Sequence, residues 1–161
     1  MAAMPYSLEF GAATDRKPPF RYAAQTRVAF SDTDAQGIVY YGRYMPYFDL
    51  ARTEYHRHLG LTGAKAAGYD FVMRANTVEY FAPARFDDLI EVYVRMRRIG
   101  STSITYEFHA WHVADDVLMV TAQQTLVLVN LARRSPVPIP SEFSQIFVAF
   151  EGEALELAAP R

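Results

Sequence analysis

An apolar stripe on one helical segment restricts the folds that this chain of 161 residues can adopt. The stripe recurs at intervals of three or four residues, as on one face of a helix, and consists of Phe48, Ala51, Tyr55 and Leu59. Pro46 fits only the first turn of this helix, because the N–H that proline lacks has no partner there. Gly60 is a natural residue to end it. A single apolar face of this length must be buried against another layer of structure.

Extended segments account for most of the remaining sequence. We expect strands over 22–30, 69–84, 89–100, 103–113 and 117–131, with a hairpin turn at 114–116. The segments 89–100 and 103–113 alternate apolar and polar residues, which indicates one buried face. Segment 117–131 is almost continuously apolar, which predicts a strand buried on both faces. A five-stranded antiparallel sheet wrapped around one long central helix would cover the stripe, so the predicted fold class is α+β.

The length favours a single domain over 1–161. Residues 1–20 contain two prolines near their end and are expected to form a flexible arm. Residues 141–150 have the pattern of a short terminal helix with Ser141 as its N-cap, and the tail that follows is expected to fray.

Composition excludes several classes of function. The formal charge of −2 gives no electrostatic basis for binding nucleic acid. No apolar run approaches the ~18 residues of a membrane span, and the first twenty residues lack the apolar core of a secretory signal. The sequence has no cysteine, which excludes disulfides, thiolate catalysis and cysteine-bound metal. We therefore expect a cytoplasmic enzyme or binding protein.

Two carboxylates precede the helix in the stretch "SDTDAQGIVYYGRY" (31–44). In an extended segment Asp32 and Asp34 point to the same side, where a carboxylate can attack an activated acyl group or act as a general base for water. The N–H groups at the helix entrance, with Tyr41 and Gly42 as candidates, can polarise a carbonyl oxygen. Ser, Thr and Asp are also ordinary turn residues, so a purely structural role of both acids is the alternative.

A longer resemblance favours the chemical interpretation. The stretch "FSDTDAQGIVYYGRYMPYFDLARTEYHRHLG" closely resembles the signature of the 4-hydroxybenzoyl-CoA thioesterase family, the hotdog-fold acyl-CoA thioesterases of the YbgC type. Further along, "VEYFAPARFDDLIEV" and "RRIGSTSITYEF" resemble the strands of that family. The resemblance covers about residues 24–145, and its motif is long and ordered.

The resemblance implies a hotdog fold and hydrolysis of an acyl-CoA thioester to free acid and CoA. By that resemblance the catalytic acid falls on Asp34, with Asp32 supporting it, and the N–H that polarises the thioester falls on Tyr41, beside Gly42. We assign substrate contacts to Gly37, Ile38, Val39 and Tyr44. The family also implies a homodimer or a tetramer built from two dimers, with active sites at the dimer interface. No metal or redox cofactor is needed, and CoA is part of the substrate.

The phosphates of CoA require cations, and the resemblance places CoA contacts near one strand end. The predicted CoA-binding residues are Arg97, Arg98, Ser101, Thr102 and Ser103. The alternative is a charged strand face that discourages edge pairing. Arg43 stands where many family members carry Asn, so it can pair with a substrate anion, with Asp32 or Asp49, or face solvent.

Three functions therefore stay open. The first is an acyl-CoA thioesterase. The second, its nearest rival, is an acyl-carrier-protein thioesterase. The third is a hotdog domain that binds acyl-CoA or an acyl carrier without turning it over. The four histidines lack metal-ligand spacing, so no metal site is expected.

Overall fold

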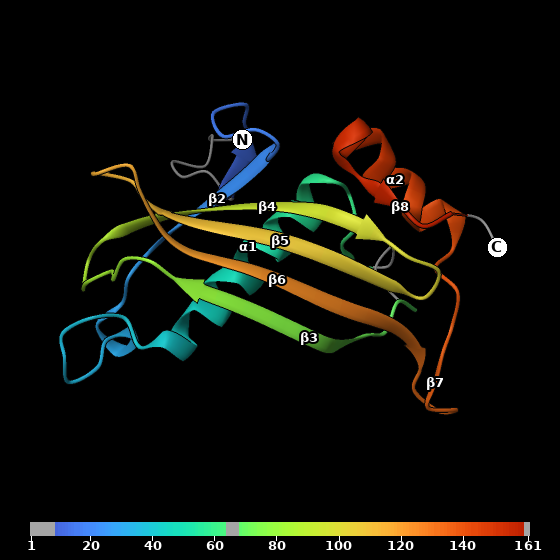
Figure 1. Cartoon of the computed structure of the whole chain (residues 1–161), viewed down its shortest axis with the longest axis horizontal. Coiled ribbons are helices and arrows are strands. Elements are labelled where there is room, and N and C mark those ends of the chain that lie inside the picture. The colour runs from blue at the N-terminus through green and yellow to red at the C-terminus, as the bar shows by residue number, and fades with distance from the viewer. Residues whose placement is uncertain (1–8, 64–67, 160–161) are drawn as a thin grey trace, which may run out of the picture.

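The computed structural model of this chain describes residues 9–63 and 68–159, which form a curved, largely antiparallel sheet around one long helix (Figure 1). The helices are α1 (Tyr44–His58) and α2 (Ser141–Glu151), and the short 3-10 helices are η1 (Phe30–Asp32), η2 (Tyr41–Arg43) and η4 (Gly152–Ala154). The eight strands within the described residues are β1 (Gly11–Ala13), β2 (Tyr22–Arg27), β3 (Phe71–Tyr80), β4 (Leu89–Ile99), β5 (Ser103–His112), β6 (Val117–Asn130), β7 (Ser135–Pro136) and β8 (Glu156–Leu157).

The sheet order is β1-β2-β4-β5-β6-β3, with β7 beside β6 and β8 beside β4. The five long strands are the five that the sequence predicts, and the α+β class is confirmed. The prediction of five strands misses β1, β7 and β8, because strands of two or three residues show no periodicity.

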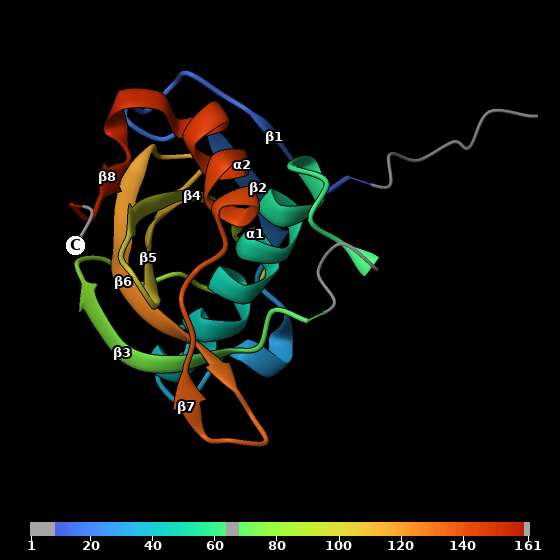
Figure 2. The ribbon, with the colours of Figure 1, turned by 90° about the vertical axis from the view of Figure 1, so that its right-hand side faces the viewer.

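The predicted stripe on α1 forms the centre of the core. Phe48, Ala51 and Tyr55 are fully buried, and the Phe48 ring lies 5.0 Å from that of Phe108 on β5. Both helices lie on the concave side of the sheet (Figure 2). The helix ends as expected at Gly60, whose positive φ of 75° allows the N–H of Leu61 to reach the carbonyl of His56 at 2.8 Å.

The prediction that 117–131 is buried on both faces is wrong. Buried residues of β6, among them Val120 and Ala122, mostly alternate with partly exposed ones, and Gln123 is exposed. The outer face of β6 carries no covering helix (Figure 1). The outer face of β6 includes Thr and Gln side chains, which are stable in contact with water. The largely apolar composition of 117–131 therefore reflects a preference for extended structure as well as burial.

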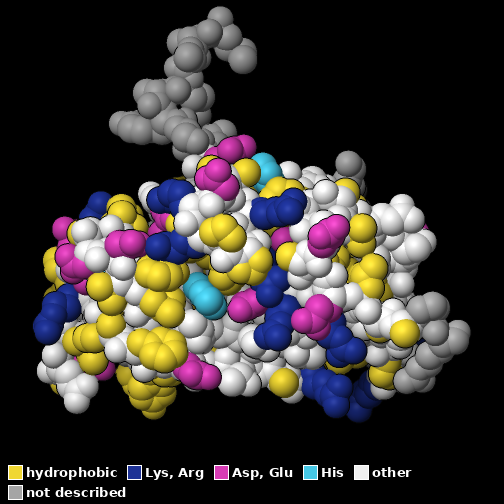
Figure 3. Space-filling model, turned by 45° about the horizontal axis from the view of Figure 1, so that its top comes forward, with side chains coloured by type: hydrophobic (Ala, Val, Ile, Leu, Met, Phe, Trp, Pro, Cys, Tyr) yellow, Lys and Arg dark blue, Asp and Glu magenta, His cyan; other side chains and the backbone are white. Residues whose placement is uncertain are grey.

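The described part of the predicted flexible arm, residues 9–20, is packed on the domain. Strand β1 pairs with β2, and Phe20 is buried on the outer face of the sheet against Tyr93. Lys17 lies 3.6 Å from the centre of the Trp111 ring, a cation–π contact that holds the arm in place. Figure 3 shows this side of the molecule, where Lys and Arg side chains are interspersed with Asp and Glu.

The tail after α2 is also ordered rather than frayed as far as it is described. Strand β8 pairs with the end of β4, through Arg98 opposite Glu156. Pro140, not Ser141, is the cap residue of α2, and its side chain makes no capping hydrogen bond.

A buried carboxyl joins α2 to the sheet. Strand β4 pairs with β2 up to Tyr93 and with β8 from Arg98, which leaves the N–H of Met96 without a strand partner. The Oε1 atom of Glu151 accepts this N–H at 3.1 Å and also accepts the hydroxyl of Tyr55. Glu151 is fully buried, and burial raises the pKa of its carboxyl.

The described residues contain no helix whose length and apolar character would allow it to cross a membrane.

Candidate active site

The loop between η1 and α1 is held in a compact turn. The N–H of Asp34 donates to the carbonyl of Ile38 at 2.9 Å, and a single bridge joins Thr33 to Val39. The N–H of Val39 donates to the carbonyl of Ala84 at 2.8 Å, which attaches the loop to the segment after β3. Two parts of the chain about fifty residues apart in sequence therefore meet at the N-terminal end of α1.

The carboxylate of Asp34 is oriented by its own turn. Its Oδ1 atom accepts the N–H of Gln36 at 2.8 Å, while its backbone carbonyl accepts the N–H of Gly37 at 2.9 Å. Gly37 has a φ of 76°, which favours glycine at this position. Oδ2 accepts no hydrogen bond from the described part of the chain, so it can face a substrate or a water.

A pocket of about 360 Å³ opens beside this carboxylate. It is lined by Asp34, Gln36, Ile38, Val39, Tyr41, Tyr44, Tyr80, Phe81, Ala82 and Pro83. One acid and a wall of aromatic and aliphatic side chains suit an apolar acyl group with a reacting carbonyl at one end.

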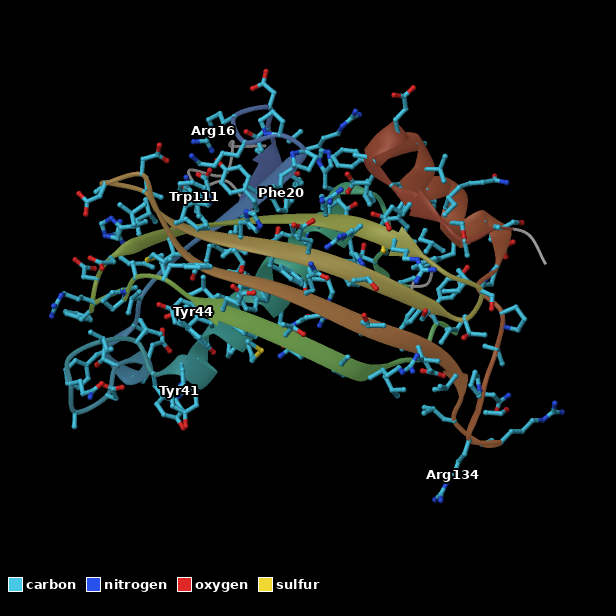
Figure 4. The ribbon with its side chains drawn as sticks, viewed as in Figure 1. Arg16, Phe20, Tyr41, Tyr44, Trp111 and Arg134 are labelled. Carbon is cyan, nitrogen blue, oxygen red and sulfur yellow. The ribbon has the colours of Figure 1, made fainter. Side chains whose placement is uncertain are left out.

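The helix entrance faces the same pocket. Tyr41, at the start of η2, lines the pocket, and η2 runs directly into α1 (Figure 4). The N–H groups of Tyr41 and Gly42 donate to no acceptor within the described residues, as expected for a first helical turn. The hydroxyl of Tyr80 donates to the carbonyl of Tyr41 at 2.9 Å and fixes this turn against β3. Free N–H groups at a helix start form a positive site next to the carboxylate.

Asp32 is engaged within the loop. Its Oδ2 atom accepts the N–H of Ala29 at 2.9 Å and the hydroxyl of Tyr47 at 2.7 Å. Arg43 lies 4.0 Å from its Oδ1 atom, which is one of the pairings that the sequence left open for Arg43. Burial and the bond to Asp32 raise the pKa of the Tyr47 hydroxyl, so Tyr47 stays a donor.

Replacing Tyr47 by Phe is expected to lower the free energy of unfolding by about 1 kcal/mol, because one hydrogen bond to a charged acceptor is lost while the ring is kept. Urea denaturation of the wild type and the variant measures this change. Phe at the neighbouring position Tyr44, whose hydroxyl meets the neutral backbone of Ala84 and not a carboxylate, serves as the matched comparison and should lose less. Equal stability of the Tyr47→Phe variant and the wild type would show that the hydroxyl contributes nothing.

Several predicted site residues lie together around one pocket. Asp34, Ile38, Val39, Tyr41 and Tyr44 line it, whereas Gly37 and Gly42 shape the turns beside it. Sequence reasoning missed Gln36, in the same loop as Asp34, and the opposite wall, Tyr80–Pro83. The aromatic pair Tyr80 and Phe81 at a strand end, shortly before a proline, was the available signal.

The predicted CoA-binding residues lie at the other end of the sheet within one chain. Strand β4 begins near the pocket and runs for eleven residues to Ile99, about 35 Å at the rise of an extended strand. Arg97 and Arg98 end this strand, and Ser101–Ser103 form the turn to β5. Within one chain the two groups of predicted site residues are therefore separated along the sheet.

The third arginine of this strand has a structural role. Arg95 is buried and forms an ion pair with Glu107 at 2.7 Å, across two strands of the outer face. Glu107, on β5, is held by His109 and Arg95, and these contacts lower the pKa of its carboxyl to about 2. Within the described residues no group of three or more His, Asp and Glu side chains could hold a metal ion.

Comparisons with known proteins agree on one family. The model of the thioesterase-like superfamily matches residues 28–147. The acyl-CoA thioester hydrolase YbgC of Escherichia coli is 34% identical over 125 residues, which cover 74% of this chain and 92% of that protein. A hypothetical protein from Aquifex aeolicus is 28% identical, with a TM-score of 0.70 over 78% of this chain and 98% of its own. A 1,4-dihydroxy-2-naphthoyl-CoA thioesterase from Synechocystis shares the fold, with a TM-score of 0.71 at 19% identity over 78% of this chain and 93% of its own.

Proposed function

The chain belongs to the thioesterase-like superfamily, and from this membership we propose that it is an acyl-CoA thioesterase that hydrolyses a thioester to a free acid and CoA. The observation that carries the proposal is that an oriented carboxylate, Asp34, and Tyr41, the first residue of the helix entrance, line one largely apolar pocket. Curated relatives that share most of the chain, including the protein from E. coli, are named as acyl-CoA thioester hydrolases or thioesterases.

In the proposed reaction the acyl group enters the pocket with its carbonyl oxygen toward the start of η2. The N–H of Tyr41, with that of Gly42 beside it, donates to this oxygen as negative charge develops there. The dipole of α1 adds to this stabilisation. Gly42 has no side chain, which lets the substrate approach the backbone.

Asp34 then acts in one of two ways. As a nucleophile its Oδ2 atom attacks the carbonyl carbon, the carbon–sulfur bond breaks, CoA leaves as a thiolate, and water hydrolyses the resulting anhydride. As a general base it takes a proton from a water that attacks the same carbon. In both cases the products are the free acid and CoA, and no metal or redox cofactor takes part.

The active form is proposed to be a homodimer, with a dimer of two dimers as a further possibility, and its sites lie at the dimer interface. Strand β3 supports this, because it is an edge of the sheet ten residues long. Its exposed apolar side chains include Val72, Met73 and Tyr80, which are 43%, 47% and 48% exposed. A long edge strand without a second strand partner among the described residues is suited to pair with a second copy of itself. The cytoplasmic location stays a prediction from the sequence.

The test is release of free thiol from a panel of aromatic, short-chain and medium-chain acyl-CoA thioesters. Saturable turnover of at least one class, with kcat/KM of at least about 10⁴ M⁻¹s⁻¹, is the expected result. Hydrolysis of acyl-carrier-protein thioesters alone would support the carrier-protein thioesterase instead. Tight binding of acyl-CoA without thiol release would support a binding protein and contradict the enzyme.

A further inference from the structure

The loop that carries Asp34 is held at its start by a turn from a distant part of the chain. This active-site loop, residues 29–38, follows Val28. The N–H of Val28 donates to the carbonyl of Asp88 at 2.9 Å, and the N–H of Asp87 donates back to the carbonyl of Val28 at 3.0 Å. Two backbone hydrogen bonds in opposite directions therefore fix the place at which the active-site loop leaves the sheet.

The far end of the active-site loop is held by the same segment, residues 84–88. The N–H of Val39 donates to the carbonyl of Ala84 at 2.8 Å. Tyr80–Pro83, which form the second wall of the pocket, run directly into this segment. The position of residues 84–88 therefore determines the position of the loop and of the opposite wall together.

The shape of segment 84–88 depends on the carboxylate of Asp88. Its Oδ2 atom accepts the N–H of Arg85 at 2.7 Å, and the N–H of Asp88 donates to the carbonyl of Arg85 at 3.2 Å. Asp87 has a φ of 69°, a conformation that residues other than glycine adopt only at a cost. Such a turn keeps its shape only while the contacts around it are maintained.

His112, at the end of β5, supports this carboxylate from the sheet. The end of β5, the start of β4 and the entrance to α1 lie at the same end of the sheet (Figure 1). The Nε2 atom of His112 lies 3.3 Å from Oδ2 of Asp88, and the two side chains are only 16% and 27% exposed. Solvent therefore screens this contact only in part.

The other ring nitrogen of His112 determines where its hydrogen lies. Nδ1 accepts the N–H of Asp115 at 3.3 Å, so the neutral ring carries its hydrogen on Nε2, the atom beside Asp88. A protonated ring is attracted to Asp88 and also to the carboxylate of Asp115, which lies 3.2 Å from Nδ1. In both forms the imidazole restrains the Asp88 side chain.

We propose that His112 and Asp88 are positioning residues for the hydrolysis. The imidazole restrains the carboxylate, the carboxylate shapes the turn, and the turn holds the active-site loop at both ends. Neither residue lines the pocket in the described part of the chain, so neither is a catalytic residue. This inference rests on the proposed function and deepens it, because it assigns what keeps Asp34 in place.

The proposed reaction is sensitive to the position of this loop. The carboxylate of Asp34 has to approach the reacting carbon, or a water, to about 3 Å while the carbonyl oxygen meets the N–H of Tyr41. A misplacement of about 1 Å can cost on the order of a hundredfold in rate. Because the loop is also joined to α1 through Asp32 and Tyr47, loss of the imidazole is expected to loosen the loop and not to release it.

The first experiment compares His112→Leu with the matched control His109→Leu. His109 lies on the same strand, 3.5 Å from Glu107 and packed on Phe20. With an acyl-CoA that the wild type hydrolyses, the kcat of His112→Leu is expected to fall about tenfold while its KM stays within about twofold. The control should keep both values within about twofold. An equal fall of kcat in the control would overturn the proposal.

Rescue and coupling separate positioning from a general loss of stability. His112→Gln can place an N–H group where Nε2 lies and is expected to recover most of the kcat. Asp88→Ala should lower kcat at least as much as His112→Leu. Combining these two substitutions should cause little further loss, because both residues act through the same turn. Fully additive losses would overturn the proposal.

Hydrogen exchange measured by NMR tests the same inference without a substrate. In His112→Leu the buried N–H groups of Val28 and Val39 are expected to exchange at least about tenfold faster than in the wild type, while those of β6 stay protected. Unchanged exchange at both positions would overturn the proposal even if kcat falls. If the wild type hydrolyses no thioester, the proposed function fails, and the exchange rates still decide whether His112 holds the active-site loop.

Discussion

Replacing Asp34 by Asn is expected to lower kcat/KM for acyl-CoA hydrolysis at least about a hundredfold, because an amide can neither attack a carbonyl nor accept the proton of water. The loss falls on the chemical step and not on the fold. The amide oxygen of the introduced asparagine can still accept the N–H of Gln36, which is the one hydrogen bond that residues 9–63 and 68–159 give to the Asp34 carboxylate. The expected result is therefore a protein with normal stability and CoA binding that releases little thiol.

The matched control is Asp15→Asn, which removes an exposed carboxylate that does not line the pocket. Its rate should equal that of the wild type. If the Asp34 variant keeps its rate within about threefold of the wild type, Asp34 is not the catalytic acid, and the structural interpretation of both acids becomes correct. Chemical quenching with hydroxylamine, which would trap an anhydride at Asp34, separates the nucleophile from the general base.

Replacing Glu151 by Ala is expected to reduce the free energy of unfolding by about 3 kcal/mol. The hydroxyl of Tyr55 would lose its acceptor, and the N–H of Met96 would keep only its longer contact of 3.4 Å with the Tyr55 oxygen, in a part of the core that water does not reach. The N–H belongs to a central strand and the hydroxyl to the central helix, so the loss weakens the junction of α2 with both layers. Urea denaturation measures the change. A loss below about 1 kcal/mol would mean that water or a shift of α2 replaces the carboxyl.

The same residue makes stability depend on pH. Burial raises the pKa of Glu151 in the folded state above its unfolded value of 4.5, so the fold favours the protonated carboxyl. The stabilising contribution is fully present below that unfolded value and is lost as the pH rises through the folded pKa. Glu151→Gln cannot ionise, so the stability of the wild type relative to this variant should fall as the pH rises from about 4.5. Parallel pH profiles of the two proteins would contradict the raised pKa.

Local patterns predicted much of this fold. The stripe from Phe48 to Leu59, the alternation over 89–100 and 103–113, and the helix end at Gly60 depend on contacts between residues a few positions apart. The same local spacing placed Asp34 and Tyr41 on either side of one turn, and these two residues line one pocket. The chemistry proposed for them came from their type and from the family signature.

Contacts between distant parts of the chain could not be predicted in this way. The pairing of β8 with β4, the packing of Phe20 on Tyr93 and the junction of Glu151 with Met96 join residues that are tens of positions apart. No local pattern in the sequence identifies such pairs. The free energy of each contact depends on which backbone groups of β4 lack a strand partner and on which surface of the sheet would otherwise be exposed.

The central helix, the long strands and the acid beside the helix entrance could be predicted from the sequence alone, because each follows from side-chain periodicity or residue chemistry within a short segment. The surroundings of that acid depend on the folding of the whole chain. The tertiary structure brought Tyr80–Pro83 across from the loop as the second wall of the pocket, and it separated Arg97 and Arg98 from Asp34 by the length of a strand. The physical reason is that the order and curvature of the sheet determine which ends of strands and helices lie close together. No single segment of the sequence encodes that order or curvature.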